Sequence, residues 1–173
     1  MSNLAENMVT AGSRARVEAA LAAGGIAAAI IEYPSGTKTA ADAAAAVGCT
    51  VGQIAKSIIF RASPSDRVVL VLTSGANRVD ESKVATGLAD VLAGDRLVKA
   101  DAAFIREQTG FAIGGVAPVG HVTPPVIAMD EDLMQHAQLW AAAGTASTVF
   151  QITPQQLVAL TNPVIINVKV DQT

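Results

Sequence analysis

Two apolar segments rich in β-branched residues, 57–62 and 67–73, are separated only by the letters SPSD at 63–66. A connection this short makes two strands antiparallel neighbours, since parallel strands need a long crossover. The two segments therefore predict a β-hairpin. A hairpin in the middle of the chain argues against a purely parallel sheet.

Helix and strand signals alternate along the rest of the chain. Capping residues before alanine-rich or amphipathic stretches predict helices, and short β-rich stretches between turn residues predict strands. The predicted helices are 14–23, 40–47, 81–87, 102–108 and 154–160, with a helical turn at 50–55, and the other predicted strands are 26–33, 95–100, 125–129, 138–142, 148–152 and 163–170. This order predicts an α+β fold with a mixed, curved sheet flanked by short helices.

The length of 173 residues is sufficient for one domain with a substantial core. Hydrophobic residues make up 51% of the chain but aromatic residues only 3%, so the core must consist mainly of Ala, Val, Ile and Leu. Residues 1–12 are small and polar, and we expect them to be a flexible N-terminus. The single domain is expected to comprise 13–173.

The charge of the chain limits its partners. A formal net charge of −3 does not suit a protein that coats DNA or RNA by charge, although a local contact with RNA stays open. No apolar run approaches the ~20 residues of a membrane span, and the first residues lack the apolar block of a signal peptide. Cys49 is the only cysteine, which excludes an internal disulfide. We expect a cytoplasmic protein without a membrane partner.

The sequence shows no pattern for a metal or a cofactor. His121 and His136, the two histidines, are each isolated from a second ligand at metal spacing. Neither a nucleophile elbow of the form GxSxG nor a nucleotide-binding glycine fingerprint is present. We therefore predict no metal site and no cofactor.

One lysine stands inside an apolar run, at Lys56 in GQIAKSIIFR. The pattern alone favours a lysine at the start of a strand whose stem covers apolar surface while its ammonium stays hydrated. Alternatively, a lysine at the rim of a pocket presents a positive charge and hydrogen-bond donors to a phosphate or an ester carbonyl. Ser57, the next residue, either adds a hydroxyl to such a site or only begins the strand.

A glycine-rich segment, IGGVAPVGH at 113–121, is the second candidate. Gly114, Gly115 and Gly120, together with Pro118, suggest a preformed loop whose backbone N–H groups can approach a ligand closely. Such donors suit a carbonyl oxygen or a developing oxyanion. The alternative is a connector whose glycines serve only to allow positive φ angles.

Two further residues have a structural and a functional interpretation. Tyr33, the only tyrosine, precedes a turn and is either a rim residue anchored by its hydroxyl or part of a pocket wall. His121 is more commonly a turn histidine than a general base. The segment GANRVDESKVA at 75–85 is first of all a helix cap followed by a solvated face.

Four segments in order, GQIAKSIIFR, GANRVDESKVA, TGFAIGGVAPVGH and AAAGTASTVFQITPQQLVALT, resemble the YbaK/EbsC family. This family contains free-standing trans-editing deacylases and the editing domain inserted in bacterial prolyl-tRNA synthetases. The resemblance extends over about 26–161. It implies a barrel-like α+β fold and a pocket for the acceptor end of a mischarged tRNA, whose aminoacyl ester is hydrolysed.

The resemblance also implies which residues act. In this family the lysine matching Lys56 is the residue most tied to activity, and the glycine-rich loop offers backbone donors around the ester. A bound water, helped by a ribose hydroxyl of the substrate, would attack without a covalent protein intermediate. The expected site is Lys56 as the catalytic residue and, for substrate binding, Tyr33, Ser57, Gly114, Gly115, Val116, Ala117, Pro118, Gly120, His121 and Gly144.

Two positions depart from the family pattern. Ala117 stands where many relatives have serine, and 144–149 lacks the Asp or His that some editing enzymes carry there. The amino acid therefore stays open among Ala, Cys and Ser; tRNA(Pro) is the expected tRNA, and a synthetase is a candidate partner. The alternatives are a non-catalytic module that binds an aminoacyl-adenosine-like ligand, and a protein-interaction domain on the same fold.

Overall fold

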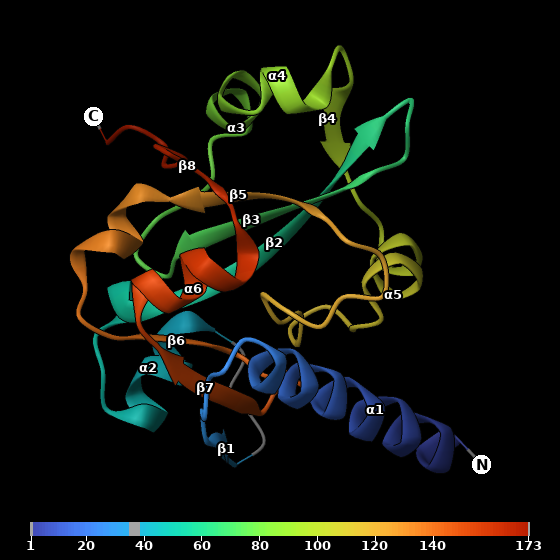
Figure 1. Ribbon diagram of the computed structural model, residues 1–173, viewed down its shortest axis with the longest axis vertical. Helices are drawn as coiled ribbons and strands as arrows, with labels where there is room; N and C mark the ends of the chain where they lie inside the picture. The colour runs from blue at the N-terminus through green and yellow to red at the C-terminus, as the bar shows by residue number, and fades with distance from the viewer. Residues whose placement is uncertain (1, 35–38, 173) are drawn as a thin grey trace.

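The computed structural model describes residues 2–34 and 39–172 of the chain. Eight strands form one mixed sheet in the order β1-β7-β6-β2-β3-β5-β8, with β4 paired to β2 beside that path (Figure 1). They are β1 (Ile30–Glu32), β2 (Ile54–Ser63), β3 (Val68–Ser74), β4 (Arg96–Lys99), β5 (Val126–Asp130), β6 (Leu139–Ala142), β7 (Thr148–Ile152) and β8 (Val164–Ile166). The predicted α+β class is confirmed.

β2 and β3 form the predicted hairpin at the centre of the sheet. Their antiparallel register extends from Ala55 opposite Ser74 to Arg61 opposite Val68. β5 pairs in parallel with the other edge of β3, and every residue of β3 is buried. A strand enclosed in this way needs a continuous apolar run, which explains the letters VVLVL.

The sheet stays open at its two ends. β1 and β8 are the terminal strands of the path, and each is three residues long. Both are shorter than the strands predicted at 26–33 and 163–170. The described sheet is thus mixed and barrel-like only in part, because its ends do not pair with each other.

Helices precede and follow most strands. They are α1 (Ser2–Ala23), α2 (Ala40–Val47), α3 (Glu81–Gly87), α4 (Ala89–Leu92), α5 (Ala102–Thr109) and α6 (Pro154–Thr161), with 3₁₀ turns η1 (Val51–Gln53) and η2 (Glu131–Gln135). The predicted caps are present at α2, α3, α5 and α6. α1 begins at Ser2, whereas the sequence predicted its start after Ser13.

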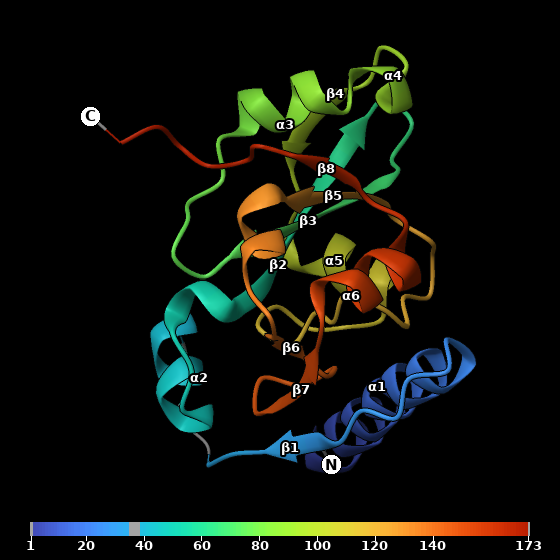
Figure 2. The same cartoon turned by 60° about the vertical axis from the view of Figure 1, so that its left-hand side comes forward.

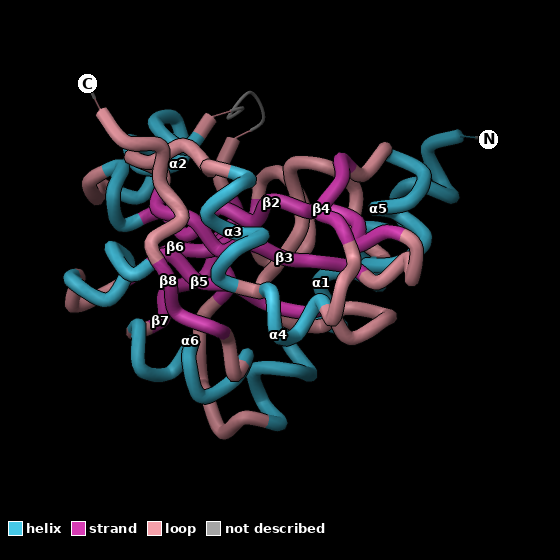
Figure 3. The backbone as a smooth tube through the Cα atoms, turned by 90° about the horizontal axis from the view of Figure 1, so that it is seen from above, coloured by secondary structure: helices cyan, strands magenta, loops and turns pink. Residues whose placement is uncertain are grey.

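The two faces of the sheet carry separate cores. On one face, side chains of α1, α5 and α6 pack on Leu70, Leu72 and Met129. On the other face, α3 and α4 pack on Val69, Val71 and Ala128. Figure 2 shows α3 and α4 at the end of the molecule opposite α1, and Figure 3 shows the strands at the centre with helices around them. Adjacent β3 residues enter different cores because side chains alternate along a strand.

None of the helices in the described parts of the chain combines the length and the apolar character needed to cross a bilayer.

Candidate active site

The candidate site lies at a gap in the strand pairing of β2 (Figure 1). β3 pairs with one edge of β2 along 55–61. The other edge pairs with β6 only at 54 and 55, and with β4 only from 60 to 63. Residues 56–59 therefore have no described strand beside them on that edge. A pocket of about 310 Å³ opens there, lined by residues 54–58.

Other parts of the chain complete this pocket, which we call the β2 pocket. α2 contributes alanines, the start of the glycine-rich loop lies across from them, and β6 and β7 supply an apolar wall. The lining outside β2 is Tyr33, Thr39, Ala40, Ala43, Ile113, Gly114, Val116, Trp140, Ala141, Ala142, Ala146 and Val149. Among all the described lining residues, including 54–58 of β2, Lys56 alone carries a charge.

Lys56 is half-buried in the β2 pocket. Its side chain lies on the same face of β2 as Ile54 and Ile58, because alternate residues of a strand share a face. Burial lowers the pKa of the Lys56 ammonium, and the negative charge of Asp130 partly opposes this shift. A partly dehydrated ammonium attracts a phosphate or a carbonyl oxygen more strongly than a hydrated one.

A polar row crosses three strands at Lys56. Thr73 of β3 lies directly opposite Lys56. Continuing the β3–β5 register by one residue places Asp130 beside Thr73. The Thr73 hydroxyl is buried and has no hydrogen-bond partner among the described residues. An ammonium and a carboxylate thus flank an unsatisfied hydroxyl, an arrangement more polar than a sheet core usually contains.

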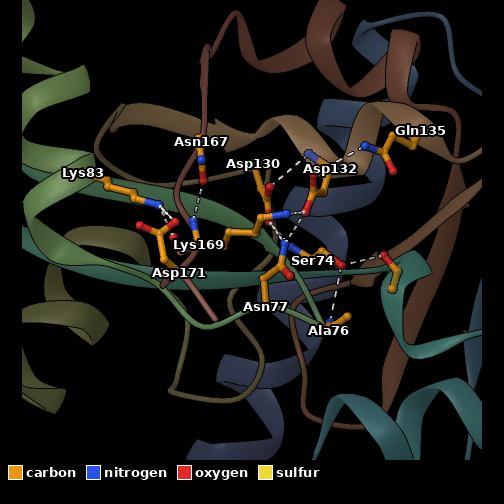
Figure 4. Close-up of polar contacts among 11 residues, drawn as sticks. Ser74, Ala76, Asn77, Lys83, Asp130, Asp132, Gln135, Asn167, Lys169 and Asp171 are labelled. Atoms are coloured by element: carbon orange, nitrogen blue, oxygen red, sulfur yellow. Dashed lines mark hydrogen bonds and ion pairs between the residues drawn. The ribbon is translucent and has the colours of Figure 1, made fainter. Parts of the chain in front are cut away.

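A hydrogen-bond network fixes the Asp130 carboxylate, which is fully buried (Figure 4). Its oxygens accept hydrogen bonds from the backbone N–H of Ser74 at 3.1 Å, from Asn77 Nδ2 at 2.8 Å and from the backbone N–H of Asp132 at 2.9 Å. Asn77 also donates to the Asp132 carboxylate, which forms an ion pair with Lys169 at 3.0 Å. The charge of Asp130 therefore acts on Lys56 from a fixed position.

The first half of the glycine-rich loop, 113–116, faces the β2 pocket. Gly114 has φ +90° and lines the pocket together with Val116. The N–H of Gly115 donates to the Ala112 carbonyl at 3.0 Å, so this donor is already used. The N–H groups of Gly114 and Val116 have no acceptor among the described residues. Among the loop residues of the described pocket lining, Gly114 and Val116 carry unpaired N–H donors, whereas the N–H of Gly115, expected from the sequence to act, is already bonded.

The second half of the loop, 117–121, turns away from this pocket. Ala117 is fully buried, and its carbonyl accepts a hydrogen bond from His121 Nε2 at 2.6 Å. Pro118, Gly120 and His121 line a different hollow, next to Ala20 of α1. Burial lowers the pKa of His121, and the positive charge of Arg16 adds to this effect. These residues lie outside the lining of the β2 pocket, so their predicted substrate-binding role stays a prediction.

Two predicted site glycines serve the packing of α1 instead. Gly120 has φ +78°, and a Cβ added there would lie 3.0 Å from the backbone of Arg16. Gly144 has φ +104°, and a Cβ would lie 2.9 Å from the backbone of Ser13. Only glycine allows both the positive φ and this close approach. Neither Gly120 nor Gly144 belongs to the lining of the β2 pocket.

Tyr33 and Ser57 both line the β2 pocket. The Tyr33 hydroxyl donates to the Ala146 carbonyl at 3.3 Å on the pocket wall, and burial raises the pKa of Tyr33. The Ser57 hydroxyl is buried and has no partner among the described residues. The pocket thus unites Tyr33, Lys56, Ser57, Gly114 and Val116, whereas Gly115, Ala117, Pro118, Gly120, His121 and Gly144 lie outside its lining.

Sequence reasoning missed several residues of this site. Trp140, the only tryptophan, lines the pocket, and its uniqueness was a usable signal. Ile113 is 64% exposed at the same pocket, although an isoleucine is normally covered. Asp130 ends the apolar strand VIAMD, but no local pattern connects it with Lys56.

The described residues contain no group of three or more His, Cys, Asp or Glu side chains that could hold a metal ion. The polar groups in the described lining of the β2 pocket are the Lys56 ammonium, backbone N–H donors and the hydroxyls of Tyr33, Thr39 and Ser57.

Comparisons with known proteins identify the family. The family model described as an aminoacyl-tRNA editing domain matches residues 34–160. A solved structure described as a candidate trans-editing enzyme for prolyl-tRNA synthetase is 42% identical, with a TM-score of 0.83, and the match covers 92% of this chain and 98% of the other. The structure of hypothetical protein APE2540 is 26% identical, with a TM-score of 0.78 over 90% and 99% of the two chains.

A curated relative is similar over most of the chain. Uncharacterized protein YwhH of Bacillus subtilis (strain 168) is 28% identical over 128 residues, which are 74% of this chain and 78% of that protein. The family model matches well over half of the chain and confirms the resemblance found in the sequence. The chain belongs to the aminoacyl-tRNA editing domain family.

Proposed function

We propose that this protein hydrolyses the ester bond of a mischarged aminoacyl-tRNA in trans, with the ester held in the β2 pocket. The observation that carries the proposal is that one pocket joins the half-buried Lys56 to the unpaired N–H groups of Gly114 and Val116. A positive charge opposite two donors suits an ester whose carbonyl oxygen gains negative charge during hydrolysis.

The residues would act by position and electrostatics. Lys56 would hold a phosphate or the ester region of the substrate, and the N–H groups of Gly114 and Val116 would polarise the carbonyl. The buried Ser57 hydroxyl is available to a ribose hydroxyl or to the attacking water. Water would add to the carbonyl carbon, the ribose oxygen would leave and take a proton, and free amino acid and tRNA would result. Holding the reactants in this geometry supplies a large part of the rate increase.

The pocket favours a small aminoacyl group. Alanines at 40, 43, 142 and 146 line it, and its volume is about 310 Å³. A larger side chain is excluded by steric overlap, while Ala, Cys and Ser can enter. The similar structure described for prolyl-tRNA synthetase supports tRNA(Pro) as the carrier. Delivery by a synthetase, and a location in the cytoplasm where tRNA is charged, belong to the same proposal.

The position of Ala117 bears on the non-catalytic alternative. Ala117 is fully buried and outside the pocket lining, so the exchange of serine for alanine at this place does not remove a hydroxyl from the β2 pocket. This position of Ala117 supports the enzyme over a binding module. A pocket lined by both Lys56 and Gly114 supports either of these over a protein-interaction domain on the same fold.

A deacylation panel tests the proposal. Purified protein is mixed with tRNA(Pro) charged with alanine, cysteine or serine, and release of the amino acid is measured. We expect hydrolysis of at least one of them, and Lys56→Ala should lower kcat/KM by about 100-fold or more because it removes the only charge in the described pocket lining.

Controls keep this test specific. Lys56→Ala should retain the circular dichroism spectrum and cooperative unfolding of the wild type. Cognate prolyl-tRNA(Pro) should be spared. If wild type leaves all three mischarged tRNAs intact, the proposal is wrong.

A further inference from the structure

A second, more polar hollow adjoins the β2 pocket on the same face of β2. Its volume is about 640 Å³, and Lys56 and Ile58 line both hollows. Phe60 continues this face, and the register places Lys99 of β4 opposite Phe60. Lys56 therefore lies at the junction of a small apolar pocket and a larger open hollow, which we call the outer hollow.

Two cations of the outer hollow have no acidic partner. Arg78 and Lys99 are exposed, and neither forms an ion pair or a side-chain hydrogen bond with a described residue. Nearby lysines differ: Lys83 pairs with Asp171 at 2.6 Å, and Lys169 pairs with Asp132 at 3.0 Å. Unpaired cations beside a hollow are available to an anionic ligand.

Of the two acidic residues that line the outer hollow, one already accepts a hydrogen bond from the protein. Asp80 lies in its lining, but its carboxylate caps α3 by accepting a hydrogen bond from the Lys83 backbone N–H at 3.1 Å. Glu81 is exposed at the start of α3 and has no such bond. Lys56, Arg78 and Lys99 outnumber these two carboxylates, so the local charge is positive although the whole chain is negative.

The proposed substrate is covalently joined to the rest of the tRNA, so the RNA chain needs a route out of the β2 pocket. A terminal aminoacylated adenosine in the β2 pocket stays joined to the preceding nucleotides through its 5′ phosphate. The remaining lining of that pocket is mostly apolar, and Lys56 is its only charged described residue. A phosphodiester chain that leaves the pocket past Lys56 enters the outer hollow directly.

We propose that the single-stranded 3′ end of charged tRNA reaches Lys56 through the outer hollow, where Arg78 and Lys99 contact backbone phosphates. This inference rests on the proposed function and adds the RNA-binding surface to it. Contacts to phosphate set affinity and register and carry no base specificity. Glu81 on the same rim opposes the phosphates.

The test compares a long and a minimal substrate of the same ester. Alanyl-tRNA(Pro) needs the outer hollow, whereas alanyl-adenosine fills only the β2 pocket. Arg78→Gln and Lys99→Gln should each raise KM for alanyl-tRNA about fivefold with kcat unchanged, and each should reduce the slope of log affinity against log salt by about 0.7. Hydrolysis of alanyl-adenosine should stay within about twofold of wild type.

Matched variants sharpen the comparison. Arg96 is on β4 with Lys99, three residues away and on the opposite face, so Arg96→Gln should change neither KM nor the salt slope. Arg78→Lys retains the charge and should restore most of the affinity. Glu81→Gln should lower KM for alanyl-tRNA, because it removes a repelling charge.

The outcomes separate this path from the proposed function. Wild-type hydrolysis of neither alanyl substrate, with cysteinyl- and seryl-tRNA(Pro) also left intact, would refute the proposed function. Normal wild-type hydrolysis with Arg78→Gln and Lys99→Gln no different from Arg96→Gln would refute the path alone. Equal losses on alanyl-tRNA and alanyl-adenosine would also refute it, since these residues would then act on the terminal nucleoside.

Discussion

The two halves of the glycine-rich loop are consecutive in sequence but lie in different environments. Segment 113–116 borders a pocket and leaves the N–H groups of Gly114 and Val116 unpaired. Segment 117–121 lies against α1, where Arg16 Nε donates to the Gly120 carbonyl at 3.1 Å and His121 donates to Ala117. The first half therefore presents two N–H donors to the pocket that contains Lys56, whereas the second half is held by its contacts with α1.

The largest expected effect comes from adding one methyl group in each half. Gly114 and Gly120 both have positive φ, so the backbone strain of alanine is similar at both positions. At Gly120 the new Cβ also meets the Arg16 backbone, whereas at Gly114 the nearest atom is 3.9 Å away. Gly120→Ala should lower the free energy of unfolding by about 3 kcal/mol, and Gly114→Ala by about 1 kcal/mol.

Activity should show the reverse order. Gly114→Ala should lower kcat about tenfold or more by displacing a donor, and Gly120→Ala should retain kcat per folded molecule. Urea unfolding and single-turnover deacylation on the same preparations check both values. Equal stability losses, or a catalytic loss at Gly120 alone, would contradict the division of the loop.

On the lysine side of the β2 pocket, the group to test is the buried Asp130 carboxylate. Its negative charge opposes the effect of burial on the pKa of Lys56. Activity that depends on the ammonium falls as pH rises through this pKa. Asp130→Asn removes the charge, so the alkaline limb of the kcat/KM profile should move to lower pH. An unmoved limb would show that the charge of Asp130 does not reach Lys56.

His121 should act on stability and not on chemistry. Because burial lowers the pKa of His121, the unfolded chain binds more protons than the folded one below about pH 6.5, and stability falls as pH decreases. His121→Gln should flatten this part of the stability curve, measured as thermal unfolding between pH 7 and pH 5. A loss of kcat in this variant, with stability retained, would show that His121 contributes to the reaction and not only to stability.

The smallest expected change in stability, as opposed to activity, is at Lys56. Its folded pKa is lowered, so the ammonium destabilises the folded state at all pH values below that pKa, and the penalty is relieved as pH rises toward the unfolded value. Lys56→Met should therefore raise the free energy of unfolding at pH 7, by less than about 1 kcal/mol because the side chain is half-exposed. A destabilised Lys56→Met would indicate that the lysine stem contributes packing instead.

Local sequence patterns predicted much of the fold. The short SPSD turn fixed the β2–β3 hairpin, and the cap at Thr39 with Asp42 fixed the start of α2. The start of α1 was misplaced because the serine at 13, which resembles a cap, lies inside the helix and donates instead to the Gly110 carbonyl. A side-chain hydrogen bond across 97 residues of sequence has no local signal.

The site was predicted less completely than the fold. Lys56 and the first glycines stood out because a charge in an apolar run and adjacent glycines are visible locally. The gap beside 56–59 was not visible, since it depends on where β4 and β6 stop pairing with β2. For the same reason Trp140 and Asp130 were missed, and glycines required by α1 were assigned to the substrate.

The interrupted pairing of β2 also bears on solubility during folding. An unpaired strand edge can add a strand from another molecule and so begin aggregation. Here the unpaired stretch is short, contains a lysine and borders the pocket that Ile113, Gly114 and Val116 also line. The loop at 113–116 therefore also limits the access of another molecule to this edge of β2. A chain shortened in this loop is expected to self-associate and to bind its ligand less well.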